Sequence, residues 1–476
     1  MIPFLIGTAG AVEVSYEDAL RMAEEANPSI AGARQDLSIA EGGLFSARGV
    51  WDPVLTSGAG RAFSTSEQRD PAFGLYYQTT TTNLWWNAGL GQTLPTGTSW
   101  SVDWENSRND FAVELDPDSP FQVEDFAAGS SSLTASLSQE LLKGHRMAYN
   151  LQAVTTAQNA VDSADAALHE KRQSVLSDVA VAYWDLVYAG QFLETSREAV
   201  AVAKEERRIV RAQLEAGNMA PVELTRVEAA VAQTELALIE AENLHASSQA
   251  KLATLLALDT MTVSVTTLPG DIPPLAIDMD KAIEATMAGN PGLRAQRIQI
   301  DAAATELVVA RHAQLPSLTA SASAGWSGYN DEVGGGYPLA RQEVFGRDFP
   351  NRYVGADFSV PLMNRAARGD LRTKAAGVTR AEIDLRAMET ALAGQVARLV
   401  RELETSQRRL ELAELNLRLA EETLLAEKAL QEAGRAIQKD VLAAQRERDA
   451  AEVEVTKART DYRKALVQLE GLQGRL

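Results

Sequence analysis

Two stretches of the chain decide its fold: residues 179–203, VAVAYWDLVYAGQFLETSREAVAVA, and residues 396–420, VARLVRELETSQRRLELAELNLRLA. In each, an aliphatic residue recurs every seven positions, and a row of mostly small residues follows it by three. The aliphatic rows are Val179, Leu186, Leu193 and Val200, and Val396, Leu403, Leu410 and Leu417; the following rows are Ala182, Ala189, Ser196 and Ala203, and Leu399, Ser406, Ala413 and Ala420. A sustained heptad repeat is typical of supercoiled helices, and small residues permit close approach, so both stretches predict coiled coils.

These helices are predicted to be very long. Proline is absent and glycine sparse over 146–215 and over 366–433, which gives roughly 70 helical residues, or ~105 Å, in each case. Each run ends near a glycine, Gly217 or Gly434, which can adopt the left-handed conformation of a helix cap. Second helices are predicted at 221–258 and 438–472, so each half contains a long helical hairpin.

The two hairpins belong to an internal duplication. An offset of 263 residues aligns Asn27-Pro28 with Asn290-Pro291, and an offset of 217 aligns Ala216-Gly217 with Ala433-Gly434. The offsets differ by 46 residues, which places extra chain in the first half. Because repetition at a fixed period marks a repeated architecture, we divide the chain into a first repeat, a linker and a second repeat. Their predicted ranges are 12–258, 259–279 and 280–476.

Side chains alternate with period two between the helices. Over 317–326, Leu318, Ala320, Ala322, Ala324 and Trp326 share one face, and serine and threonine occupy the other. Similar alternation predicts four strands over about 53–141 and two over about 316–362. A polar face opposite an apolar, tryptophan-bearing face is what a transmembrane barrel requires, although a soluble sandwich has the same pattern. An even number of strands between helices that enter and leave on one side favours the membrane interpretation.

The tryptophans and loops extend the membrane interpretation. Trp86, Trp100, Trp104 and Trp326 are predicted at the membrane interfaces. A tight turn is predicted at 95–97 and long loops at 64–83, 108–130 and 328–351, as in barrels with short periplasmic turns. Six strands are too few to close a barrel, and open edges cannot face lipid, so the chain is predicted to oligomerise.

Composition excludes several classes of function. The 476 residues include 45 basic and 65 acidic side chains, which give a net charge of −20 and argue against nucleic-acid binding. The absence of cysteine excludes disulfides and thiolate metal sites. The four histidines are far apart in sequence and have no metal-binding spacing, so we predict no metal, no cofactor and no catalytic residues.

The first eleven residues allow two interpretations. Ile2 to Ala11 is a short apolar stretch that ends in Ala-Gly-Ala, the pattern of a signal-peptidase site, but it has no basic start. It is either the remnant of an export signal or an ordinary apolar N-terminus.

The duplicated plan resembles the TolC family of outer-membrane efflux proteins from about Val14 onward. The resemblance rests on the two Asn-Pro pairs, on Pro53 and Pro316 before the strands, on Gln139-Glu-Leu141 and on the tip motif Ala-Gly-(x)5-acid-aliphatic. It implies a mainly α protein with transmembrane β: a homotrimer with a shared barrel in the outer-membrane lipid of a Gram-negative bacterium and a helical tunnel across the periplasm. It also implies a periplasmic adaptor and an inner-membrane transporter as partners, in efflux or type I secretion.

The number of strands departs from the family's usual plan. That plan has four strands per subunit and twelve per trimer, whereas six per chain predict eighteen. An alternative is that the hairpin near 86–107 forms an external lobe and the barrel keeps twelve strands.

The resemblance also assigns roles to the hairpin tips. Acids after the tip glycine line the family's closed aperture, and Asp440 and Glu223 match the first of these positions. Ala443 and Arg226 occupy the second, so the double acidic ring is incomplete. Alternatively, both acids merely begin a helix and interact with its N-terminal dipole. The predicted adaptor contacts are Ala216, Gly217, Asn218, Ala433, Gly434 and Arg435.

Two other classes of protein remain compatible with the sequence. A coiled-coil scaffold of the envelope would explain the heptads but not the strands. A periplasmic adaptor combines helical hairpins with β-structure but lacks this duplication. The cargo of a channel could be a drug, a metal ion or a secreted polypeptide.

Overall fold

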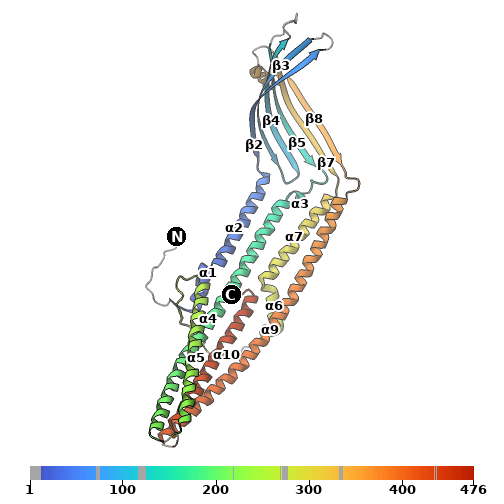
Figure 1. Ribbon diagram of the computed structural model, residues 1–476. Helices are drawn as coiled ribbons and strands as arrows, with labels where there is room; N and C mark the ends of the chain where they lie inside the picture. Colours follow the sequence, from blue (N-terminus) through green and yellow to red (C-terminus); the bar gives the residue numbers. More distant parts are fainter. Residues whose placement is uncertain are drawn as a thin grey trace. The chain divides into compact units, whose positions relative to one another are not determined.

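The computed structural model (Figure 1) describes residues 12–70, 75–115, 125–217, 219–268, 270, 277–331, 336–433, 435 and 437–476. The predicted signal remnant at 1–11 and the tip residues Asn218 and Gly434 lie outside the described residues. The chain divides into two compact units. A helical unit comprises the N-terminal part up to residue 39, 162–298 and 382–476, and a sheet unit comprises 40–161 and 299–381.

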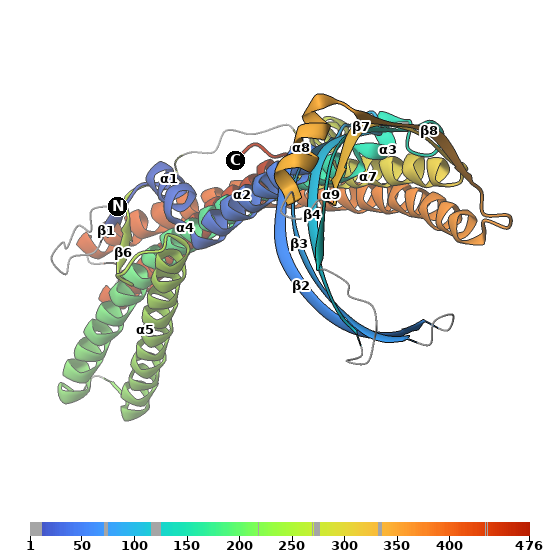
Figure 2. The same cartoon turned by 90° about the horizontal axis from the view of Figure 1, so that it is seen from above.

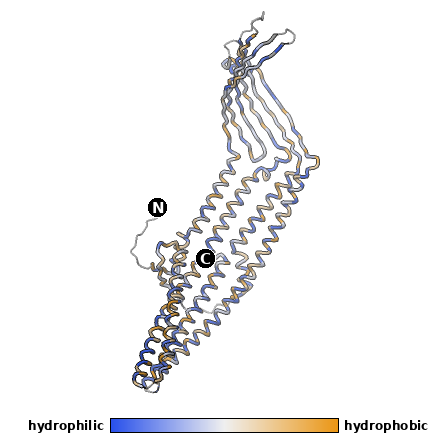
Figure 3. Tube along the Cα trace, in the orientation of Figure 1, coloured by the Kyte–Doolittle hydropathy of each residue, from blue (hydrophilic) through white to orange (hydrophobic). Residues whose placement is uncertain are grey.

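The helical unit is built from two long hairpins and shorter helices. Its elements are α1 (Tyr16–Ala26), α2 (Pro28–Arg48), α4 (Gln152–Glu215), α5 (Pro221–Leu255), α6 (Met279–Gly289), α7 (Pro291–Ala313), α9 (Arg365–Glu432) and α10 (Gln438–Leu472). Helices α2, α4, α7 and α9 also contribute residues to the sheet unit. None of the described helices has a stretch long and apolar enough to cross a membrane. Figure 3 shows hydrophilic and hydrophobic residues interspersed along them.

The heptad rows form the buried seams of the long helices. In α4 every residue of both predicted rows is buried. In α9 both rows are buried except Leu417, which is partly buried against Leu410 and Val455. The small side chains of the second row lie inside the seam, where a larger residue would push the neighbouring helix away. This burial confirms the prediction of coiled-coil packing.

The two Asn-Pro pairs form equivalent hydrogen bonds. The Asn27 amide donates to the carbonyl of Leu255 at 2.8 Å, and its side-chain oxygen accepts from the Ser29 amide at 2.9 Å. The Asn290 amide donates to Leu472 at 3.0 Å, and its oxygen accepts from Leu293 at 3.0 Å. Each asparagine therefore joins the last turn of a hairpin's return helix to the first turn of α2 or α7. We call these two sites the asparagine junctions.

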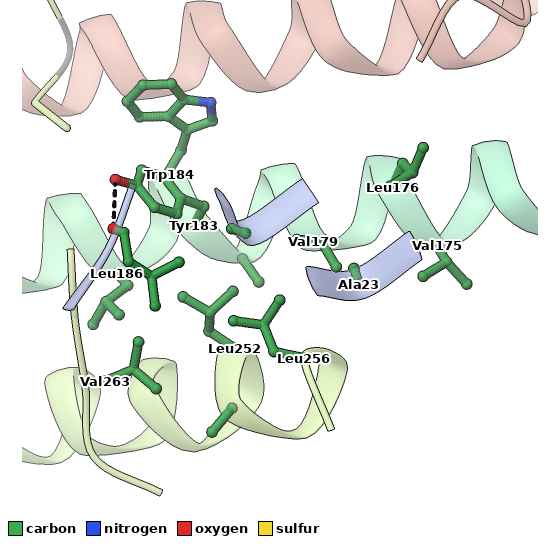
Figure 4. Close-up of a cluster of buried hydrophobic side chains, with 14 of the residues drawn as sticks. Ala23, Val175, Leu176, Val179, Tyr183, Trp184, Leu186, Leu252, Leu256 and Val263 are labelled. Atoms are coloured by element: carbon green, nitrogen blue, oxygen red, sulfur yellow. Dashed lines mark hydrogen bonds between the residues drawn. The ribbon is translucent and has the colours of Figure 1, made fainter. Parts of the chain in front are cut away.

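A small sheet and an aromatic core lie beside the first junction. Strands β1 (Val12–Val14) and β6 (Val263–Val265) pair in parallel. The buried Tyr183 hydroxyl donates to the Val14 carbonyl at 3.3 Å (Figure 4) and accepts from the Thr267 amide at 3.0 Å. Tyr16 stacks on Trp184, and burial, with a smaller contribution from Glu470, raises the pKa of Tyr16 to about 12. The N-terminal strand is thereby fixed to α4 and to the segment after α5.

The sheet unit holds one antiparallel sheet of six strands (Figure 2). In spatial order these are β2 (Val54–Asp70), β3 (Leu75–Thr93), β4 (Thr98–Leu115), β5 (Phe126–Glu140), β7 (Ser317–Asn330) and β8 (Phe349–Ser359). A 3-10 turn, η1 (Gly49–Trp51), precedes the sheet, α3 (Met147–Asn150) follows β5, and α8 (Gly336–Gly346) lies between β7 and β8. Four strands thus come from the first half and two from the second, as predicted.

One alternative and one prediction about this region are wrong. The hairpin near 86–107 pairs on both sides within the sheet, so the alternative of an external lobe is excluded. The predicted loops at 64–83 and 108–130 consist largely of strand, because β2 to β5 extend well into both ranges. In the first range, residues such as Thr79 to Thr82 are polar on both faces and lack the alternation by which a strand is recognised.

Candidate functional site

Unbroken registers give the six-stranded sheet two continuous faces. Each pair of neighbouring strands keeps one register along its whole described length, with no bulge. Side chains alternate strictly between faces in such a ladder. We call the face that carries Trp104 and Leu133 the apolar face, and the face that carries Asp103 and Ser132 the polar face.

The four tryptophans predicted at membrane interfaces all lie on the apolar face. The rings of Trp86 and Trp104 meet edge to face at 4.8 Å, and Trp104 meets Phe345 of α8 at 5.8 Å. The guanidinium of Arg347 lies 5.3 Å from the centre of the Trp326 ring. Trp100 is near the turn into β4 and has no ring partner among those described.

Helix α8 covers part of the apolar face. It buries Ala340 and Val344, and a side chain at Gly328 would collide with the Ala340 carbonyl at 2.0 Å. Nearby, Trp104 Nε1 donates to Ser131 at 3.2 Å, and Ser131 donates to Asn106 at 2.8 Å. The sequence predicted a loop at 328–351, because an eleven-residue helix with two buried aliphatic residues gives little periodic signal.

The polar face carries negative charge without positive charge. Its acidic residues with described side chains are Asp103, Glu105, Glu140 and Asp357, and the described strands place no lysine or arginine on it. The arginines of these strands, Arg61, Arg69, Arg108 and Arg352, all fall on the apolar face. Serine and threonine are the commonest of its other residues, and together with the unopposed acids they make this face favour water and cations over anions.

Backbone geometry forms the hairpin tips. Gly217 has φ of +75°, which favours glycine over residues with a side chain, and its amide donates to Leu214 at 2.9 Å. Pro221 then opens α5 at its first position, where a missing amide hydrogen costs nothing. At the second tip the Arg435 amide donates to the Leu430 carbonyl at 2.8 Å. Ala216, Gly217, Ala433 and Arg435 are exposed.

Both candidate aperture acids have local partners. Glu223 forms an ion pair with Arg226 at 2.9 Å, one turn along α5. The Asp440 carboxylate accepts from the Ile437 amide at 3.3 Å, across the first turn of α10. The contacts of Asp440 are those expected of an acid at a helix N-terminus. Its role at an aperture stays a prediction.

Comparisons with known proteins identify the family. The model of the outer membrane efflux protein family matches residues 19–258 and 282–475. The chain belongs to this family. Protein CyaE of Bordetella pertussis is 27% identical over 172 residues, so the match spans 36% of this chain and 36% of that relative.

Solved structures show the same fold. The outer membrane protein VceC from Vibrio cholerae has a TM-score of 0.63 at 17% identity, with 96% of each chain covered. The Campylobacter jejuni CmeC outer membrane channel has a TM-score of 0.67 at 14% identity, over 97% of this chain and 85% of that one. The outer membrane efflux protein described here therefore shares the fold of these outer-membrane proteins over nearly its whole length.

The efflux protein also buries charges between its two hairpins. Glu206 of α4 is buried and pairs with Arg446 of α10. Asp449 of α10 is 3% exposed, and burial raises the pKa of its carboxyl while Arg448, at 3.1 Å, opposes that shift. Nearby Glu198 and Glu452 raise this pKa further. No sequence pattern indicates this cluster, because charged residues are frequent all along α10. Among the described residues, no group of three or more histidine and acidic side chains is arranged to hold a metal.

Proposed function

We propose that three copies of this efflux protein form an exit duct across the outer membrane. The observation that carries the proposal is the pair of open sheet edges. Strands β2 and β8 are the two edges of a sheet of six alternating strands, so they run in opposite directions. β8 of one copy can therefore pair antiparallel with β2 of the next, and three such contacts make a closed ring of eighteen strands.

Exposed leucines on the hairpins support the same assembly. On α9, Leu412, Leu415 and Leu419 form a stripe with exposed fractions of 67%, 48% and 52%. On α5, Leu236 and Ile239 are 57% and 62% exposed. Contiguous apolar side chains on a water-facing helix mark a contact surface. A neighbouring copy covers both stripes in the proposed trimer.

The remaining sites take their proposed roles from this assembly. The tips, Ala216, Gly217, Ala433 and Arg435, contact a periplasmic adaptor, which links the duct to an inner-membrane transporter. Their exposure supports this assignment. The tip residues Asn218 and Gly434 belong to the same proposal and lie outside the described residues.

Glu223 and Asp440 face the periplasmic opening in this proposal. Three copies of Asp440 narrow the opening and attract cations, since like charges at a constriction raise the local cation concentration. Single-channel recording on Asp440→Ala tests the role, and lower cation selectivity is expected. An unchanged selectivity would leave Asp440 as a helix-start residue alone.

The tryptophans contact lipid in this arrangement. Trp86, Trp100, Trp104 and Trp326 share the apolar face, and we place them at its membrane interfaces. The cargo passes along the polar face, as a drug, a metal ion or a secreted polypeptide.

Extraction and conductance test the duct as a whole. The protein is expected to require detergent, to migrate as a trimer on an unheated gel and as a monomer after heating, and to conduct ions in planar bilayers. A protein that stays monomeric in solution without detergent contradicts the assembly. A detergent-dependent trimer with no conductance points instead to a structural role in the envelope.

A further inference from the structure

A cavity of about 720 Å³ lies on the polar face. Two neighbouring rows of the strand register line it. One row is Trp85, Ser107, Ser130 and Tyr329, and the other is Asn87, Glu105, Ser132, Ser327 and Phe349. We call this cavity the serine bowl, because four serines form its floor.

Aromatic rings stand at both sides of the serine bowl. Trp85 comes from β3, and Tyr329 and Phe349 come from β7 and β8. Three strand spacings, roughly 14 Å, separate the positions of Trp85 and Tyr329. All three rings are exposed, although the positions between them in the two rows carry only serine, asparagine and glutamate. Strict alternation predicts polar residues here, so the three aromatics need an explanation other than core packing.

Glycines of the edge strand hold the Trp85 ring. A side chain at Gly60 would come within 2.7 Å of the ring, and one at Gly58 within 3.1 Å. The ring therefore lies over the β2 backbone and forms one wall of the bowl. The floor stays open because serine side chains are short.

Glu105 supplies the charge of the bowl. It sits in the second row between Asn87 and Ser132, and no hydrogen bond or ion pair of its carboxylate is recorded among the described residues. Asp103, one row away on the same strand, instead accepts from the Ser101 hydroxyl at 2.7 Å. With no basic residue on the polar face of the described strands, an organic anion has no partner here.

We propose that the serine bowl binds organic cations that carry aromatic rings. The positive centre faces Glu105, and the rings of the ligand contact Trp85 on one side and Tyr329 and Phe349 on the other. Electron-rich ring faces attract cations, and the effect adds to that of the carboxylate. The site deepens the proposed duct, since it then lies on the wall that the cargo passes. Binding at the bowl itself needs only the sheet of one copy.

Two probes of matched shape and opposite charge test the proposal. Tetraphenylphosphonium and tetraphenylborate are titrated into the full-length protein in detergent, and binding is followed by equilibrium dialysis. Tetraphenylphosphonium is expected to bind at least tenfold more tightly than tetraphenylborate. Equal binding of both ions, or tighter binding of the anion, overturns the proposal.

Substitutions then locate the site. Glu105→Gln and Trp85→Ala are each expected to weaken tetraphenylphosphonium binding about fivefold. Asp357→Asn is the matched control, because it removes a carboxylate from the same face outside the bowl and is expected to leave affinity unchanged. An equal loss in the control, or no loss in Glu105→Gln, overturns the assignment to the bowl. Maltose is the uncharged comparison, and maltose binding that depends on Trp85 but not on Glu105 would assign the bowl to sugars.

The same variants separate this inference from the proposed duct. Glu105→Gln is expected to keep the heat-sensitive trimer. If it does so and still binds tetraphenylphosphonium normally, the bowl proposal fails while the duct stands. The opposite outcome is also possible to recognise. If the wild-type protein forms no trimer but binds the cation, and Glu105→Gln weakens that binding as predicted, the duct proposal is contradicted and the bowl proposal is supported.

Discussion

The two long hairpins share one sequence plan but differ in how much of it the chain itself covers. Helix α4 buries 18 of its 64 residues, whereas α9 buries 10 of its 68, so α9 leaves more apolar surface uncovered. Both have a heptad seam packed against their own return helix. Helix α9 carries in addition the stripe of Leu412, Leu415 and Leu419, which the described residues leave about half to two-thirds exposed. The duplicated hairpins thus share a buried seam, and in the proposed trimer the larger exposed stripe of the second hairpin contacts a neighbouring copy.

The largest expected effect comes from charging that stripe. The double substitution Leu412→Asp and Leu419→Asp is expected to abolish the trimer. Burying an unpaired carboxylate in the contact costs more free energy than the apolar contact contributes to assembly. Analytical ultracentrifugation in detergent measures the change. Leu412→Met with Leu419→Met is the control and is expected to keep the trimer, since it preserves volume and polarity. A trimer in the charged variant would mean that α9 faces water in the assembly.

The two seams are expected to be equally sensitive within the chain. Leu186 and Leu403 are each 1% exposed, and replacing either with alanine is expected to cost about 2–5 kcal/mol of folding free energy. Denaturant titration followed by circular dichroism gives both values. Unequal costs would show that one seam collapses around the cavity and the other does not. Leu412→Ala is the control, because Leu412 lies on α9 like Leu403 but is exposed. This control is measured in the dissociated protein, where no neighbouring copy covers Leu412.

Substituting the asparagine at each junction tests whether the two halves of the chain are structurally equivalent. Asn27→Ala and Asn290→Ala each leave a carbonyl of a return helix without its donor, and each is expected to cost about 1–3 kcal/mol. Thermal unfolding in detergent is expected to shift by similar amounts for the two variants. Asn→Asp at either site removes the amide donor but keeps the oxygen that caps the next helix, so a smaller loss is expected. A large loss at one site only would break the equivalence of the halves.

The smallest expected effect concerns the charge buried between the hairpins. The pKa of Asp449 is raised by burial, so the folded state holds this proton more tightly than the unfolded state does. Stability from this group is therefore greatest at low pH and falls as pH rises from the ordinary aspartate pKa through the folded value. Asp449→Asn is expected to unfold at higher denaturant than wild type at pH 7.5, and the gain is expected to vanish near pH 3. A gain that does not vary with pH would exclude the carboxylate as its cause.

The sequence predicted the helices better than the sheet, for a physical reason. The long hairpins follow from heptads such as Val179 to Val200, where burial repeats in register with the helix. Strand ends such as Ser64 to Ser66 carry no alternation, and α8 is too short for a periodic signal. The buried cluster of Glu206 and Asp449 depends on contacts between helices far apart in sequence.

The candidate sites, too, were predicted where the sequence shows a local pattern and missed where it does not. The alternation of Trp100, Val102 and Trp104 predicted the apolar face, and the glycine at 217 predicted a turn. The serine bowl was missed because its two rows draw on five strands, and the sequence pattern assigned a place to Trp86 but not to Trp85. The pairing register shows which residues of the neighbouring strands lie beside Trp85.

In the proposed barrel, the bulge-free sheet of each copy leaves a single integer to determine, the register between neighbouring copies. Strand tilt and radius follow from the number of strands and the total shear, and every stagger within one copy is already fixed by its registers. The offset at which β8 meets the next copy's β2 is the only remaining term. The chain has no cysteine of its own. One engineered disulfide between β8 of one copy and β2 of the next would therefore fix the tilt and the width of the proposed barrel.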